Sequence, residues 1–179
     1  IEGVFTAQKR FLKSVPGIGE EIASQIANSK TIFLTAEEEL DHLEKKEINY
    51  TFFLDADYPS RLKNFADAPL LLFTKGNIDL NPERSVAIVG TRKPTIYGKT
   101  VTEESIDAIA PYDVTIISGL AYGIDITSHR HCVAIDLPTI GVMGSGMGVI
   151  YPDAHTMVAH KMMLKGGIIT EFSYETGPD

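Results

Sequence analysis

Residues 85–100 read SVAIVGTRKPTIYGKT, and this stretch decides the predicted fold. It begins with an apolar, largely β-branched run, passes through a glycine and continues into a segment with helical signals. An apolar run, a glycine loop and an amphipathic segment, in that order, are typical of a strand followed by a helix in an α/β sheet. We therefore predict a strand at Val86–Val89 and a helix at about Lys99–Ala110.

The same unit recurs along the chain. Further strands are predicted at Val114–Ile117 and Thr139–Met143, with helices following at Ile124–Ile135 and about Ala154–Leu164. A fourth apolar run, Ile168–Thr170, ends the series. Strands that are apolar nearly throughout are typical of a parallel sheet covered by helices on both faces. The predicted fold is a Rossmann-like, doubly wound, mainly parallel α/β sheet.

The chain is predicted to have three parts. Residues 1–49 carry apolar positions at helical spacing and predict a small N-terminal helical unit of helix-hairpin-helix or SAM-like type. Residues 50–84 contain short apolar runs around a proline-containing polar stretch, which predicts a linker and an edge strand. Residues 85–179 form the Rossmann-like domain, and because they stop soon after a predicted strand, we expect a piece of a longer protein.

The composition limits the classes of function. Sixteen basic against 24 acidic side chains give a net charge of -8, so any nucleic-acid site must be local. No apolar run approaches the ~20 residues that span a bilayer, and the N-terminus lacks signal-peptide order, so we expect a cytoplasmic protein. The single cysteine, Cys132, lies in an apolar stretch and is predicted to be a small core residue.

The loops that leave the carboxyl ends of the predicted strands should form the ligand crevice. The first loop, Gly90 to Gly98, places Arg92 and Lys93 directly after a buried strand. A guanidinium can grip phosphate with two hydrogen bonds, an ammonium adds positive charge, and free amides at a helix start add donors. We predict an anion site here, with a solvated turn as the alternative.

The second and third loops are rich in glycine. The second, residues 118–125, reads SGLAYGID, with Gly119 and Gly123 where the backbone turns tightly or approaches a ligand and with Ser118 exposed at the strand tip. The third is Gly144–Gly148. Neither loop matches a dinucleotide or ATP fingerprint, so no cofactor is predicted. Each loop alone is as readily explained by a structural role.

The histidines predict no catalytic centre. Asp125 and His129 are one helical turn apart, as in a metal pair or an acid-base couple, with His131 close by. A third ligand at suitable spacing is missing, so we favour Asp125 as a helix cap hydrogen-bonded to His129. His155 and His160 are predicted to be ordinary helix positions. No G-x-S-x-G elbow is present either.

Near the amino end, the sequence Val15-Pro-Gly-Ile-Gly19 predicts the turn of a helix-hairpin-helix. Such turns offer backbone amides to a DNA phosphate. However, Glu20 and Glu21 begin the second helix, where their carboxylates would repel phosphate. We favour a structural or partner-docking hairpin, with DNA contact as the alternative.

Taken together, the motifs resemble the DprA/Smf family of DNA-processing proteins over nearly the whole chain. The sequences that carry the resemblance are Tyr58-Pro-Ser-Arg-Leu62, Leu72-Phe-Thr-Lys-Gly76, Val86-Ala-Ile-Val-Gly-Thr-Arg92, Tyr97-Gly98, residues 118–125 with His129, Gly144-Ser-Gly146, Val149-Ile-Tyr-Pro152 and Gly166-Gly-Ile-Ile-Thr-Glu171. The resemblance implies an extended Rossmann fold that binds single-stranded DNA in a basic crevice. It also implies a homodimer that loads a RecA-type recombinase during natural transformation.

The resemblance also implies which positions line the DNA pocket. They are Gly90 and Arg92 of the G-x-R turn, with Ser118, Gly119 and Gly123 of the second loop. Charge and stacking considerations add Lys93, Tyr97 and Lys161. Tyr122 stands where the family often has a basic residue or alanine, and its ring can either stack on a base or narrow the pocket.

The function predicted is non-catalytic, sequence-independent binding of single-stranded DNA. The alternative is a phosphoribohydrolase of the lysine-decarboxylase-like type, which also holds phosphate on glycine loops, although its PGGxGTxxE signature is absent here. A third possibility is a scaffold that contacts only proteins through its amino-terminal helices.

Overall fold

The computed structural model describes residues 2–178, apart from the side chains of residues 2 and 29–31. The chain forms two compact units, Ile1–Lys45 and Lys46–Asp179. The predicted linker at 50–84 contributes strands to the second unit and is therefore part of the sheet domain.

The first unit is helical, with elements α1 (Glu2–Thr6), α2 (Lys9–Leu12), α3 (Glu20–Ala27) and α4 (Ser29–Lys45). The turn between α2 and α3 passes through Gly17, whose φ of 89° is the left-handed conformation that glycine adopts without strain. Leu12 and Ala23 are buried where α2 packs on α3. The helix, turn and helix predicted here are therefore present.

The second unit is built on a sheet whose six strands, within the described residues, lie in the order β1-β2-β6-β5-β4-β3. The strands are β1 (Asn49–Phe52), β2 (Leu71–Gly76), β3 (Ser85–Ala87), β4 (Thr115–Gly119), β5 (Thr139–Val142) and β6 (Gly166–Thr170). β3, β4, β5 and β6 run parallel to one another, whereas β2 runs antiparallel to both of its neighbours, β1 and β6. The predicted Rossmann-like, mainly parallel sheet is confirmed.

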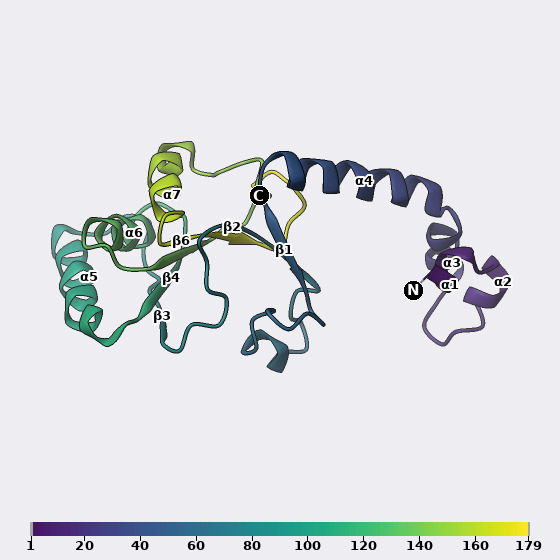
Figure 1. Cartoon of the computed structure of the whole chain (residues 1–179), viewed down its shortest axis with the longest axis horizontal. Helices are drawn as coiled ribbons and strands as arrows, with labels where there is room; N and C mark the ends of the chain where they lie inside the picture. Colours follow the sequence, from purple (N-terminus) through teal and green to yellow (C-terminus); the bar gives the residue numbers. More distant parts are fainter. Residues whose placement is uncertain (1, 179) are drawn as a thin grey trace. The chain divides into compact units, whose positions relative to one another are not determined.

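The helices α5 (Ile96–Ile109), α6 (Ile124–Ala134) and α7 (Thr156–Met162) connect the parallel strands and lie together on one side of them (Figure 1). Strands consecutive in sequence are neighbours in the sheet, so right-handed crossovers place these helices on the same face. The second helical layer of a doubly wound sheet is not among residues 2–178.

The core lies between these helices and the sheet. Ile116 of β4 is fully buried in a cluster with Ile106 of α5 and Cys132 of α6. The prediction that Cys132 is a small core residue is confirmed, and burial raises the pKa of its thiol to about 11.

Several element boundaries differ from the predictions. α5 begins at Ile96, three residues early, because the Thr95 hydroxyl caps it by accepting a hydrogen bond of 3.1 Å from the Gly98 amide. The helix predicted at about 154–164 is shorter than expected, because a 3-10 turn (Asp153–His155) precedes α7 and α7 ends at Met162. Short 3-10 turns also occupy Leu62–Asn64 and Ala110–Tyr112.

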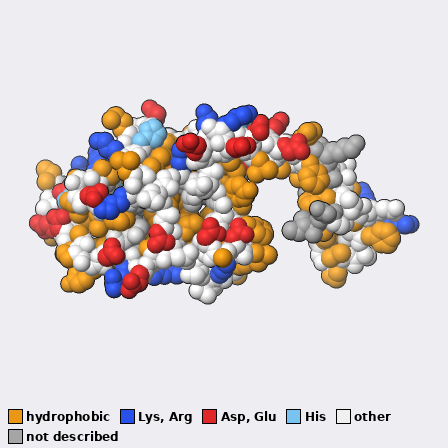
Figure 2. Space-filling view, viewed as in Figure 1, with side chains coloured by type: hydrophobic (Ala, Val, Ile, Leu, Met, Phe, Trp, Pro, Cys, Tyr) orange, Lys and Arg blue, Asp and Glu red, His pale blue; other side chains and the backbone are white. Residues whose placement is uncertain are grey.

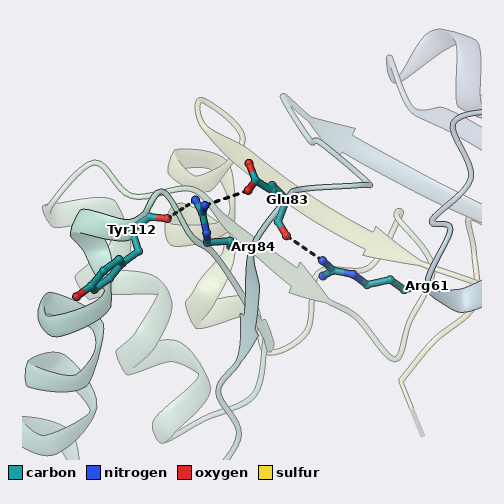
Figure 3. A network of polar contacts seen from close by, with 4 residues as sticks. All are labelled: Arg61, Glu83, Arg84 and Tyr112. Atoms are coloured by element: carbon teal, nitrogen blue, oxygen red, sulfur yellow. Dashed lines mark hydrogen bonds and ion pairs between the residues drawn. The ribbon is translucent and has the colours of Figure 1, made fainter.

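The opposite face of the sheet carries the segment that contains the Tyr58-Pro-Ser-Arg-Leu motif. Figure 3 shows Arg61 and Arg84 reaching Glu83 from two sides. Arg61 donates hydrogen bonds of 2.6 Å to the Ser85 hydroxyl and 2.9 Å to the Glu83 carbonyl, and Arg84 bonds the Glu83 carboxylate and the Tyr112 carbonyl. The motif therefore anchors its segment to the start of β3. Beside it, a cavity of about 530 Å³ exposes apolar side chains of the sheet.

Candidate nucleic-acid interface

The first and second loops are in contact at the carboxyl ends of β3 and β4. The Ile124 amide donates a hydrogen bond of 3.2 Å to the Thr91 carbonyl. A Cβ on Gly123 would lie 2.1 Å from that carbonyl oxygen and 2.7 Å from the Cα of Arg92, and Gly123 has a φ of 91°. Only glycine fits between the loops at this position. The structure thus brings together the two loops that the sequence predicted to share a crevice.

The other glycines of these loops are also explained by internal packing. A Cβ on Gly90 would lie 2.6 Å from Cγ1 of Ile124, and one on Gly119 would lie 2.5 Å from Oδ2 of Asp125. Close approach of protein atoms therefore accounts for the absence of a side chain at both positions. These glycines shape the loops whether or not they contact a ligand.

The prediction that Ser118 is exposed is wrong. Only 2% of its surface is accessible, and its hydroxyl donates a hydrogen bond of 2.5 Å to the Ile88 carbonyl. The reason is that β4 continues to Gly119, so Ser118 is a residue inside a central strand and not at its tip. Its role is to tie β4 to the backbone that follows β3.

The first loop presents free positive charge. Arg92 and Lys93 are exposed, and neither forms an ion pair with any acidic side chain of the described chain. In the first turn of α5, the amides of Ile96 and Tyr97 have no hydrogen-bond partner within residues 2–178. Elsewhere acidic and basic side chains are interspersed over the face seen in Figure 2. Unpaired cations and free helix amides are groups that can bind an anion.

Both aromatic residues of the predicted site are accessible. Tyr97 is 77% exposed in the first turn of α5, and Tyr122 is 50% exposed in the second loop.

Lys161 does not lie at the first and second loops. It lines a cavity with Asp136 and Leu137, which precede β5, and so lies toward the amino ends of the strands. Its inclusion in the crevice was wrong, because α7 runs away from the loops before it reaches this residue.

Residues 49–179 match the sequence model of a family described as DNA recombination-mediator protein A. The chain belongs to this family. Protein Smf of a Synechocystis species is 29% identical to it, over 100% of this chain and 46% of that protein. The DNA processing protein DprA of Bacillus subtilis is 39% identical, over 68% of this chain and 41% of that protein. The chain thus spans less than half the length of these relatives.

Solved structures of recombination-mediator proteins have the same fold. DprA from Streptococcus pneumoniae superposes with a TM-score of 0.66 and 25% identity, covering 99% of this chain and 65% of that chain. The Helicobacter pylori protein, described for its single-stranded DNA binding mode, gives a TM-score of 0.64 and 28% identity, covering 73% of this chain and 59% of that chain.

Within the described residues of our chain, no helix is long and apolar enough to cross a membrane.

In this member of the recombination-mediator family, the buried side chain of His129 is hydrogen-bonded to the backbone of the second loop. Its Nε2 lies 2.8 Å from the Gly119 carbonyl oxygen and its Nδ1 2.8 Å from the Thr139 hydroxyl. Because a carbonyl only accepts, Nε2 carries the proton. Burial lowers the pKa of His129, which favours the neutral form of the ring. Both nitrogens are occupied by these partners, so the prediction of a hydrogen bond between His129 and the Asp125 carboxylate is wrong.

His155 supports the same loop at the next residue, which the sequence analysis missed. Its side chain is only 2% exposed, and its Nδ1 donates a hydrogen bond of 2.7 Å to the Leu120 carbonyl. The prediction of an ordinary helix position was wrong, because His155 belongs to the turn before α7 and points into the core. The only signal in the sequence was its position shortly after the third glycine loop.

The third loop is filled by the chain itself. The Gly146 amide donates to the Thr176 carbonyl at 2.8 Å, and the Gly148 amide donates to the Tyr174 carbonyl at 2.9 Å. A Cβ on Gly146 would lie 1.9 Å from the carbonyl oxygen of Ser173. Of the two interpretations open from the sequence, the structural one applies to this loop.

The helix-hairpin-helix turn of the first unit has its nearby cations neutralised. Glu20, at the start of α3, forms ion pairs with both Lys9 and Lys13. Hydrogen bonds from Lys13 and Lys9 lower the pKa of the Glu20 carboxyl to about 2. These two lysines are paired with a carboxylate and are not free for phosphate, which favours a structural hairpin over DNA contact.

Proposed function

We propose that this protein binds single-stranded DNA, without catalysis and without sequence preference, at the surface formed by the first and second loops. The observation that carries the proposal is the pair of exposed, unpaired cations, Arg92 and Lys93, beside free amides at the start of α5. In a chain of net charge -8, such charges favour one local polyanion site over general attraction. Membership of a recombination-mediator family and the DNA binding described for the Helicobacter pylori relative support it.

The groups of this surface can make two kinds of contact with DNA. Arg92 is suited to a bidentate contact with one phosphate, and the amides of Ile96 and Tyr97 add donors that carry no sequence information. Tyr97 and Tyr122 offer aromatic faces on which bases of any kind can stack. Phosphate contact and stacking together give affinity with little discrimination among sequences.

The remaining parts of the proposal concern the whole protein. As a member of a family described as recombination mediators, it is proposed to deliver single-stranded DNA to a RecA-type recombinase in the cytoplasm, and to do so as a homodimer. The DNA contact comes first in this scheme, and it is the part that the described surface supports.

The decisive experiment is fluorescence anisotropy of a labelled single-stranded oligonucleotide over a salt series, with duplex DNA as competitor. The variants are Arg92→Ala and the matched control Lys161→Ala, which removes an exposed charge toward the amino ends of the strands. We expect Arg92→Ala to weaken binding roughly ten- to 100-fold, the value of one charge-assisted hydrogen bond. The slope of log K against log salt should fall by about 0.7 for each phosphate that the variant no longer neutralises.

Lys161→Ala should leave affinity and slope unchanged. Equal effects of the two substitutions would show that only net charge matters and would overturn the assignment of the site. Unchanged affinity in Arg92→Ala would remove its central residue.

A further inference from the structure

Two buried histidines hold consecutive carbonyl groups of the second loop. His129 donates to the carbonyl of Gly119 at 2.8 Å, and His155 donates to the carbonyl of Leu120 at 2.7 Å. The histidines come from different elements, α6 and the turn before α7, and both are almost completely buried. The peptide groups that join Gly119 to Leu120 and Leu120 to Ala121 are therefore held from inside the protein, directly ahead of Tyr122 in the loop.

Tyr122 itself is half supported and half open. Its ring meets the ring of His155 edge-on, with centroids 4.8 Å apart and an interplanar angle of 71°. Edge-to-face packing of this kind is a favourable arrangement of two aromatic rings. Yet 50% of Tyr122 remains accessible, while His155 is 2% accessible. One side of the tyrosine ring thus packs against the buried His155 ring, and the rest of it is exposed to solvent.

We propose that His155 is a positioning residue that holds Tyr122 as a preformed platform for one unpaired nucleobase of the bound strand. The inference rests on the proposed DNA-binding function and adds the base contact to it. An exposed tyrosine on a mobile loop would lose rotamer and backbone freedom when a base stacks on it, and that loss weakens binding. Here the hydrogen bond to Leu120 fixes the backbone and the His155 ring fixes the side chain, so much of that loss has already occurred in the free protein.

The occupant is a base because the open surface is an uncharged aromatic ring. Every nucleobase has a π-face, so a stacked contact tolerates any sequence, whereas duplex bases are stacked on one another and cannot reach it. Phosphates are served by Arg92 and Lys93 of the neighbouring loop. The contact therefore provides the preference for single strands that phosphate contacts alone do not give.

The test compares a single-stranded oligonucleotide with an abasic strand of equal length, using Tyr122→Ala, Tyr122→Phe and Arg92→Ala. Tyr122→Ala should weaken binding of the normal strand roughly five- to 100-fold, the range found when base stacking is removed, and leave binding of the abasic strand unchanged. Tyr122→Phe should keep both affinities. If Arg92→Ala weakens binding of both strands while Tyr122→Ala affects them equally, the platform is refuted and the DNA site stands. If neither substitution matters, the DNA site itself is wrong.

Two substitutions at His155 separate its hydrogen bond from its ring. His155→Asn keeps an N–H donor near the position of Nδ1 but removes the ring, whereas His155→Phe keeps a ring and removes the donor. We expect both to reduce the ratio of normal to abasic affinity, because each removes one of the two supports of Tyr122. Proton NMR without DNA gives an independent readout, since the ring signals of Tyr122 should shift toward those of a free tyrosine.

Thermal unfolding shows whether each His155 variant is folded, and the Tyr122 variants change an exposed side chain, so they test the platform even if one histidine variant does not fold. An unchanged ratio of affinities and unchanged Tyr122 signals in folded His155→Asn would overturn the positioning role.

Discussion

Gly123 lies so close to Thr91 that a Cβ at residue 123 would be 2.1 Å from the Thr91 carbonyl oxygen. The next residue, Ile124, donates its amide to the same carbonyl. The glycine loop after β4 and the cationic loop after β3 are therefore one packed unit. A change where they meet should alter the position of Arg92 without touching its side chain.

We predict that Gly123→Ala destabilises the protein and weakens DNA binding together. The new methyl group meets backbone atoms, and alanine at a φ of 91° is strained, so the free energy of unfolding should fall by about 1–3 kcal/mol. Urea unfolding measures the stability, and anisotropy with single-stranded DNA measures binding in the folded protein. The control is Gly144→Ala, since a Cβ on Gly144 meets nothing within 4 Å. Equal stability of the two variants would show that the loops are not in contact.

The stability of the protein should depend on pH through His129. Burial lowers the pKa of this histidine in the folded state, so between that value and the ordinary pKa of about 6.5 the unfolded chain binds more protons. The contribution of the neutral His129 ring to the free energy of unfolding is complete above about pH 6.5. It is lost as the pH falls below that value, by at most about 1.4 kcal/mol per pH unit. Urea unfolding from pH 7.5 to 5 measures this slope.

His129→Asn is the comparison for that measurement, because asparagine cannot titrate. Its overall stability should be lower, since the contacts with Gly119 and Thr139 are altered, but its loss of stability with acid should be shallower. A wild-type curve no steeper than that of the variant would mean that His129 is protonated as readily in the folded protein as in the unfolded chain.

The thiol of Cys132 should be inert in the native protein. It is fully buried, and desolvation raises its pKa to about 11, so the reactive thiolate is scarce at neutral pH. A disulfide reagent such as Ellman's should therefore react with the folded protein much more slowly than with protein in urea, where the full stoichiometry of one thiol is expected. Rapid labelling of the folded protein would place Cys132 outside the core.

The helix-hairpin-helix turn gives a prediction that separates a structural role from DNA contact. NMR titration of the Glu20 carboxyl should give a pKa of about 2, and Lys13→Ala should raise it, since Lys13 makes the largest contribution to lowering it. Glu20→Gln frees both lysines from their carboxylate partner. With a structural hairpin, its affinity for single-stranded DNA stays at the wild-type value. A salt-sensitive gain in affinity would instead show that the hairpin reaches DNA.

Much of the fold could be predicted because its signals are local. The four apolar runs from residue 85 onward form β3 to β6. The start of α5 was predicted at about Lys99, whereas the helix is capped by Thr95 and begins at Ile96. The site was predicted less well. Arg92, Lys93 and Tyr122 are accessible as expected, but Ser118 and Lys161 are not where they were placed. A strand's exact end and a helix's direction depend on neighbours that are distant in sequence.

The sequence by itself determined the class of fold, the resemblance to a family and the cationic loop after the first parallel strand, since hydrophobic periodicity and the glycine loops are properties of short segments. Only the tertiary structure decided which loops meet, which glycine loop the chain fills with its own backbone, and that His129 and His155 hold carbonyls 10 and 35 residues away. Such contacts join residues through packing in three dimensions, and periodicity along the chain carries no record of them.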